Sequence, residues 1–101
     1  MTTKIEKENT KAVILLDGRL DTPSAATVEK EVQAVMDGTI SETLVDCTNL
    51  SYISSSGLRI LITLNKHFMK MGGKLTLKGL LPEIKEVFDM TGFSSIFDIV
   101  D

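Results

Sequence analysis

Two short apolar runs, each followed by a segment with helical spacing, constrain the fold of this chain more than any other feature. Residues 12–16 and 44–47 have the composition of buried strands, and apolar residues then recur at every third or fourth position. Strands that alternate with helices predict an α/β fold with a mainly parallel sheet and right-handed crossovers. The length of 101 residues fits one domain that spans residues 1–101.

Turn and cap residues predict where the elements begin and end. Strands 4–8 and 12–16 are expected to form a hairpin, the first at the sheet edge and the second covered on both faces. Thr22 as N-cap and Pro23 begin a helix that Asp37 and Gly38 end. The further predicted elements are a strand at 43–47, a loop at 48–53, a helix from about 56 to 71, a strand at 74–78, a helix from 82 to 92, and a short strand or helical turn at 96–100. The sheet is therefore expected to be mixed, mainly parallel and four- to five-stranded, with helices packed on it.

The long helix has three faces on a helical wheel. One face is apolar and is expected against the sheet: Gly57, Ile60, Leu61, Leu64, Phe68 and Met71. The opposite face is polar and is expected in water: Arg59, Thr63, Lys66 and Lys70. A flank between them carries Leu58, Ile62 and Met69, joined by Asn65. Either a neighbouring helix covers this flank, or it is an exposed apolar surface for a partner.

Charge and composition exclude several classes of function. The net charge is -3 and no Lys/Arg cluster occurs, so nothing favours binding to nucleic acid or to an anionic membrane. The polar N-terminus and the lack of a long apolar stretch predict a cytoplasmic protein. Cys47 is the only cysteine, so no internal disulfide forms, and its apolar strand predicts a buried, inert thiol.

Three serines, Ser54, Ser55 and Ser56, precede Gly57 at the predicted start of the long helix. A helix start has unpaired N–H groups and a partial positive charge. It therefore suits a serine that only caps the helix, and it equally suits a hydroxyl that accepts a phosphate. The residues alone leave both interpretations open, and the two are compatible. Asp21 and Asp46 would surround such a phosphate if both point to the same end of the sheet.

The chain resembles a known family in three segments. Gly18-Arg19-Leu20-Asp21, the segment from Leu44-Val45-Asp46-Cys47 through Ser55-Ser56-Gly57-Leu58, and Phe88-Asp89-Met90-Thr91-Gly92-Phe93 occur in the order and rough spacing of the anti-sigma-factor antagonists. These are single-domain STAS proteins of bacteria. The resemblance implies that Ser56 is phosphorylated by an anti-sigma factor, a GHKL-type serine kinase, and is restored by a PPM-type phosphatase.

The same resemblance implies a binding role that the phosphate switches off. By the same resemblance Asp21 would lie near the phosphorylation site. The flank of the long helix with Leu58, Ile62 and Met69, together with Arg59, is then the surface expected to contact the partner. The sequence departs from many members at Ser54, where they have an acidic residue. This difference indicates a different kinase or a member that is not phosphorylated, such as a binding subunit of a lipid-transport or sensor assembly.

An enzyme is not expected. His67, the only histidine, lies eleven residues after Ser56 in the predicted helix, which is roughly 16 Å at the helical rise and too far for a catalytic base. One Cys and one His give no metal-ligand spacing, and no Gly-rich phosphate-binding motif occurs. We therefore expect no metal and no cofactor.

Overall fold

The computed structural model describes all 101 residues and contains one five-stranded sheet. Its strands stand in sequence order: β1 (Thr2–Glu8), β2 (Lys11–Leu20), β3 (Glu42–Ile53), β4 (Lys74–Lys78) and β5 (Asp98–Val100). β1 pairs antiparallel with β2, and every other pair is parallel. The prediction of a mixed, mainly parallel α/β sheet is confirmed.

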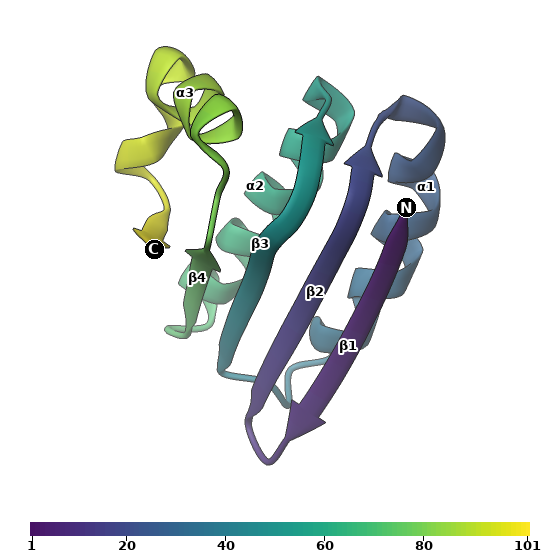
Figure 1. The fold of residues 1–101 in the computed structure, drawn as a ribbon. Coiled ribbons are helices and arrows are strands. Elements are labelled where there is room, and N and C mark those ends of the chain that lie inside the picture. Colours follow the sequence, from purple (N-terminus) through teal and green to yellow (C-terminus); the bar gives the residue numbers. More distant parts are fainter.

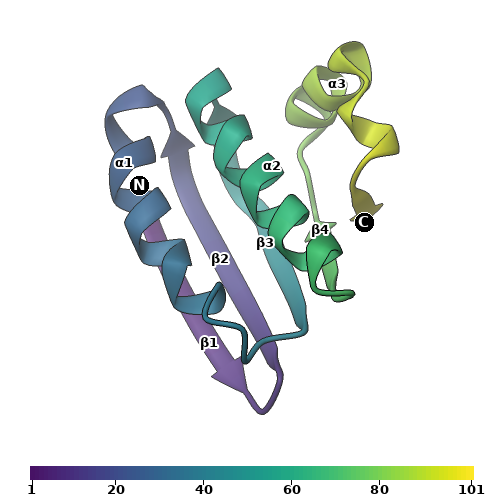
Figure 2. The ribbon, with the colours of Figure 1, turned by 180° about the vertical axis from the view of Figure 1, so that it is seen from behind.

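The helices are α1 (Thr22–Val32), α2 (Ser55–Lys70) and α3 (Pro82–Thr91), with short 3-10 turns η1 (Gln33–Val35) and η2 (Phe93–Ser95). Two of the three helices, α1 and α2, cover one side of this sheet, and the third lies beyond the end of β4 (Figure 1 and Figure 2). In the view from behind, α1 and α2 lie in front of the strands, and α3 follows the end of β4 (Figure 2). The opposite view shows the sheet with no helix over β1, β2 and β3 (Figure 1).

The core fills the space between the sheet and the helices. Ile14 and Leu16 point into it and are fully or almost fully buried, whereas Val13 and Leu15 are only half-buried on the other face. The prediction that residues 12–16 are covered on both faces is therefore wrong. The reason is the topology, because the helices that follow β2 and β3 both return across the same face.

Several element boundaries differ from the sequence prediction. The second strand does not stop at residue 16 but continues to Leu20, and the first helix ends at Val32, before the predicted stop at Asp37 and Gly38. Asp21, not Thr22, caps α1, and its carboxylate and the Ser24 hydroxyl form a reciprocal capping box. A carboxylate accepting from the third helical N–H is the stronger cap here, so Thr22 becomes the first helical residue. β3 also continues through the predicted loop at 48–53, because β2 pairs with it as far as Leu20 opposite Ile53.

The flank of α2 is partly covered. Leu58 is only 8% exposed, and Asn65 is buried and donates to the Ile96 carbonyl after η2 at 3.4 Å. Ile62 is half-buried, whereas Met69 is 65% exposed. The expectation that Leu58 belongs to an exposed partner surface is therefore wrong, because it packs into the core. Met71 is also exposed rather than sheet-facing, since α2 ends at Lys70.

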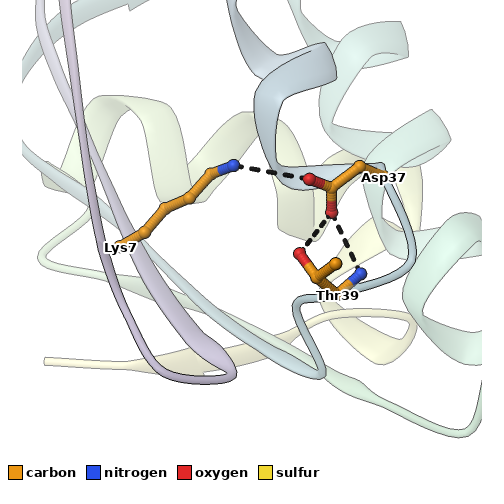
Figure 3. A network of polar contacts seen from close by, with 3 residues as sticks. All are labelled: Lys7, Asp37 and Thr39. Atoms are coloured by element: carbon orange, nitrogen blue, oxygen red, sulfur yellow. Dashed lines mark hydrogen bonds and ion pairs between the residues drawn. The ribbon is translucent and has the colours of Figure 1, made fainter.

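A polar network fixes the loop that leads into β3. The Asp37 carboxylate accepts hydrogen bonds from the N–H and the hydroxyl of Thr39 at 3.0 and 2.6 Å, and Lys7 of β1 lies 3.5 Å away (Figure 3). The two Thr39 donors, supported by Lys7, lower the pKa of Asp37 from 3.8 to about 2. This network lies far from the predicted serine site, at the amino-terminal ends of the parallel strands.

Candidate functional site

The candidate site lies at the carboxyl ends of β2 and β3, where α1 and α2 begin. Leu20 and Ile53 are paired at the end of the ladder, and the Ser54 N–H donates to the Leu20 carbonyl at 2.8 Å. This backbone bond joins the end of β2 to the start of α2. The starts of the two helices therefore stand side by side at the upper end of the sheet (Figure 1).

The three serines have different environments. The Ser54 hydroxyl accepts the Gly57 N–H at 3.1 Å and is the N-cap of α2. Ser55 is exposed as the first helical residue, and Ser56 is half-buried. No hydrogen bond engages the Ser56 hydroxyl. Capping therefore belongs to Ser54, and Ser56 retains an unoccupied hydroxyl.

Gly57 permits the close approach of α2 to the end of β2. A Cβ atom at this position would lie 2.5 Å from the Leu20 Cγ and 3.0 Å from the Leu20 carbonyl oxygen. Cβ atoms in proteins are essentially never found 2.5 Å from another side-chain carbon, so Leu20 or the start of α2 would have to move. The glycine after Ser56 therefore sets the position of the serines above the end of β2.

Asp21 lies beside this site but is engaged elsewhere. It directly follows Leu20, whose carbonyl binds Ser54, and it accepts from the Ser24 N–H at 3.0 Å and the Ser24 hydroxyl at 2.8 Å. These hydrogen bonds lower the pKa of Asp21, with a smaller contribution from Arg19. The carboxylate is therefore ionised and adds negative charge near the start of α2.

Asp46 does not lie near the serines. It is eight residues before Ser54 in the extended strand β3, a separation of about 25 Å at the strand rise. Its carboxylate accepts from the hydroxyl and the N–H of Thr48, which lower its pKa. The expectation that Asp46 surrounds the phosphate is wrong, because β3 continues six residues beyond the predicted end at Cys47.

A groove between α1 and α2 opens next to Ser56. It has a volume of about 290 Å³ and is lined by Ser56, Arg59 and Thr63 from α2, and by Thr22 and Glu29 from α1. Neither Thr22 nor Glu29 was predicted to belong to a functional site. The spacing of Ser56 and Arg59, three residues apart on one helix, is the only sequence signal for this groove.

The charges on the exposed face of α2 are all positive. They belong to Arg59, Lys66 and Lys70, and no acidic residue occurs in the helix. None of the three takes part in an ion pair. Because they fall within about 40° of one another on the helical wheel, they form one line along the helix. We call Arg59, Lys66 and Lys70 the cationic line.

Other reactive side chains lie outside the site. α2 carries both Ser56 and His67, which stand about 16 Å apart along the helix. The His67 ring packs edge-on against Phe68, with the centroids 4.9 Å apart. Cys47 is fully buried, and burial raises the pKa of its thiol to about 12. None of the helices is both long and apolar enough to span a bilayer.

Comparison with known proteins gives a consistent match. The STAS domain model matches residues 2–101. BtrV of Bordetella bronchiseptica, assigned as an anti-sigma factor antagonist, is 32% identical over 101 residues, which is all of this chain and 87% of BtrV. The structure superimposes on TM1081 of Thermotoga maritima, assigned likewise, with a TM-score of 0.90 at 16% identity over 98% of this chain and 86% of that one. It also superimposes on the anti-sigma factor antagonist SpoIIAA in its unphosphorylated form, with a TM-score of 0.80 and 19% sequence identity. This superposition covers 99% of this chain and 88% of SpoIIAA. The structure of SpoIIAA has also been solved in the phosphorylated form.

Proposed function

This chain belongs to the STAS-domain family, and we propose that it acts as an anti-sigma factor antagonist. In this role it binds an anti-sigma factor and so regulates transcription that depends on the sigma factor. The likeness to BtrV over the whole chain supports the proposal. The observation that carries it is the Ser56 hydroxyl, which is half-exposed, free of hydrogen bonds and held at a capped helix start.

Phosphorylation of Ser56 is the switch in this proposal, and the anti-sigma factor is itself a GHKL-type serine kinase. The Ser56 oxygen forms a bond to the γ-phosphorus of kinase-bound ATP, ADP leaves, and the hydroxyl proton passes to a base of the kinase. A PPM-type phosphatase hydrolyses the phosphate and restores the serine. Because Ser54 already caps α2, modification of Ser56 leaves the helix start intact.

The charge of the phosphate explains why binding would be lost. A phosphoserine carries about -1.5 to -2 charges at neutral pH. A partner that covers Ser56 would have to remove water from this charge, which is unfavourable without a new cation. The ionised carboxylate of Asp21 beside the site adds to the repulsion of an acidic partner.

The exposed face of α2 is the proposed docking surface. It combines the cationic line with the exposed Met69 and the half-buried Ile62, and it extends away from Ser56. The facing surface of the anti-sigma factor is then acidic and apolar. A phosphate at Ser56 is negatively charged and repels an acidic surface, which agrees with phosphorylation switching binding off.

Single substitutions at Ser56 test the switch. The anti-sigma factor is recovered on the tagged chain from its own cells, identified by mass spectrometry, and purified. We expect Ser56→Asp to weaken its binding by at least about tenfold. Ser56→Ala binds like wild type but is not released by ATP, and the intact mass of wild type rises by one phosphate at Ser56. Thr27→Asp, which adds the same charge on the exposed face of α1, serves as the control.

The outcome also separates the two candidate roles. If both Ser56 variants bind and release the kinase as wild type does, Ser56 is not the switch. A partner that co-purifies stably, with no phosphate gained under ATP, indicates a non-phosphorylated binding subunit of a larger assembly, such as a lipid-transport or sensor complex. Ser54, in the position where many antagonists have an acidic residue, is the feature that keeps this alternative open.

The docking surface has its own test. Lys66→Glu combined with Lys70→Glu reverses two charges of the cationic line without touching Ser56. We expect roughly tenfold weaker binding and a flatter salt dependence, because the acidic partner surface loses its attraction. Lys30→Glu with Lys85→Glu changes the net charge equally at exposed positions on α1 and α3. Equal affinities of the two double variants would contradict docking on this face.

A further inference from the structure

The groove between α1 and α2 holds an unpaired cation close to Ser56. Arg59 lies three residues after Ser56 in α2, and both line the groove. Side chains with this spacing are neighbours on a helix, with Cβ atoms about 5–6 Å apart. Arg59 is exposed and makes no ion pair, and no hydrogen bond engages the Ser56 hydroxyl. The Arg59 guanidinium is therefore free to bind a phosphoryl group that is attached to the Ser56 hydroxyl.

The other arginine of the chain is already occupied. Arg19 stacks over the Tyr52 ring with its guanidinium carbon 4.2 Å from the ring centroid, at the ends of β2 and β3. Glu29 supplies the only carboxylate of the groove, from the α1 side. Arg59 is thus the cation best placed for a group attached to Ser56, and Glu29 is the group that competes for it.

We propose that the phosphoryl group of modified Ser56 lies in the groove between α1 and α2 and is paired there with the Arg59 guanidinium. This inference rests on the proposed phosphorylation of Ser56. A guanidinium presents two parallel N–H donors that match two phosphate oxygens. An anion that precedes the cation along the helix is also the favoured orientation of such a pair.

The pairing gives the phosphate a second effect on the docking surface. The phosphate adds negative charge at Ser56. Its pairing with Arg59 also turns that side chain away from the cationic line, so only Lys66 and Lys70 still present positive charge to the partner. An acidic partner therefore loses an attractive contact as well as meeting a repulsive one. The pair also holds the phosphate against the domain, so a phosphatase has to separate it from Arg59 before hydrolysis.

Phosphorus NMR on the isolated phosphoprotein tests the pair directly. Phosphoserine is incorporated at position 56 during translation by an expanded genetic code, so no kinase is needed. The second pKa of the phosphate is then read from its chemical shift across pH 4 to 8 (a range about its ordinary value near 6). We expect this pKa in Arg59→Gln to be higher than in wild type by about half a unit, because the cation that favours the dianion is gone.

Matched variants separate the pair from general effects. Arg59→Lys keeps a charge and retains part of the shift, whereas Glu29→Gln removes the competitor and lowers the pKa further. Arg19→Gln makes the same chemical change at the arginine that stacks on Tyr52, and it leaves the titration within about 0.1 unit of wild type. Far-ultraviolet circular dichroism confirms that each variant is folded.

Two results overturn the inference. One is an identical titration of wild type and Arg59→Gln, and the other is an equal shift in Arg19→Gln. Neither result bears on whether cells phosphorylate Ser56, because the phosphoserine is installed without a kinase. Conversely, absence of the phosphate after incubation with ATP and the anti-sigma factor removes the proposed switch and leaves the measured Arg59 pairing unchanged.

Discussion

Gly57→Ala tests how closely α2 must approach the end of β2. The added Cβ would lie 2.5 Å from the Cγ and 3.0 Å from the Cδ2 of Leu20, whose side chain is fully buried and has no room to turn away. The Leu20 carbonyl oxygen, also 3.0 Å away, is fixed by its hydrogen bond from Ser54. The substitution therefore forces the start of α2 away from the sheet.

Two effects of opposite sign decide how much Gly57→Ala changes the free energy of unfolding. Replacement of glycine by alanine within a helix stabilises it by up to about 1 kcal/mol. Overpacking in a rigid core costs about 1–3 kcal/mol. Because the clash involves backbone as well as side chain, we expect it to prevail, with a net loss of about 1–2 kcal/mol. For a chain of this size the midpoint of thermal unfolding then falls by between about 5 and 15 °C.

Calorimetry and urea unfolding measure this loss, with Ser55→Ala as the control. Ser55 is exposed in the same helical turn, so its replacement changes the free energy of unfolding by less than about 0.5 kcal/mol. In a Leu20→Ala background the clashing Cγ and Cδ2 are absent, and the cost of Gly57→Ala falls by about 1 kcal/mol. A Gly57→Ala variant as stable as wild type, or more stable, would refute the reasoning.

Two further predictions concern the polar groups that fix the chain locally. Ser54→Ala removes the N-cap of α2 and lowers the free energy of unfolding by about 1 kcal/mol in urea titrations, more than Ser55→Ala does. Asp37 has a pKa of about 2 in the fold, below its ordinary 3.8, so its carboxylate stabilises the fold above about pH 4, and this contribution is lost as the pH falls towards 2. Asp37→Asn therefore flattens the acid-induced loss of stability between pH 4 and 2, whereas a curve parallel to wild type would contradict this role for the network with Thr39 and Lys7.

The types and order of the elements could be predicted because they depend on local periodicity. The strand at Lys74–Lys78 was predicted to the residue, since its alternation of polar and apolar side chains is strict. The extension of β3 through Thr48–Ile53 was not predicted. That segment is polar, and it forms a strand only because β2 continues beside it through two register shifts.

The site was partly predictable for the same reason. The order of the serines and the glycine indicated a helix start, but only the structure assigns capping to Ser54 and leaves Ser56 free. Asp46 was misplaced because its distance from the serines depends on the length of β3. Leu58 was misplaced because a helical wheel gives an angle but not the neighbours, which here extend the core around that side of α2.

The backbone bond from Ser54 to Leu20 has a consequence for the thermodynamics of recognition. The start of α2 is preorganised, held by a backbone hydrogen bond, an N-cap and a glycine contact, so no segment there has to be ordered when a partner arrives. The heat-capacity change on association should therefore match the contact area alone, without the excess that accompanies coupled folding. Modification of such a surface therefore acts through the charge that it presents to the partner, and not through a change in its backbone conformation.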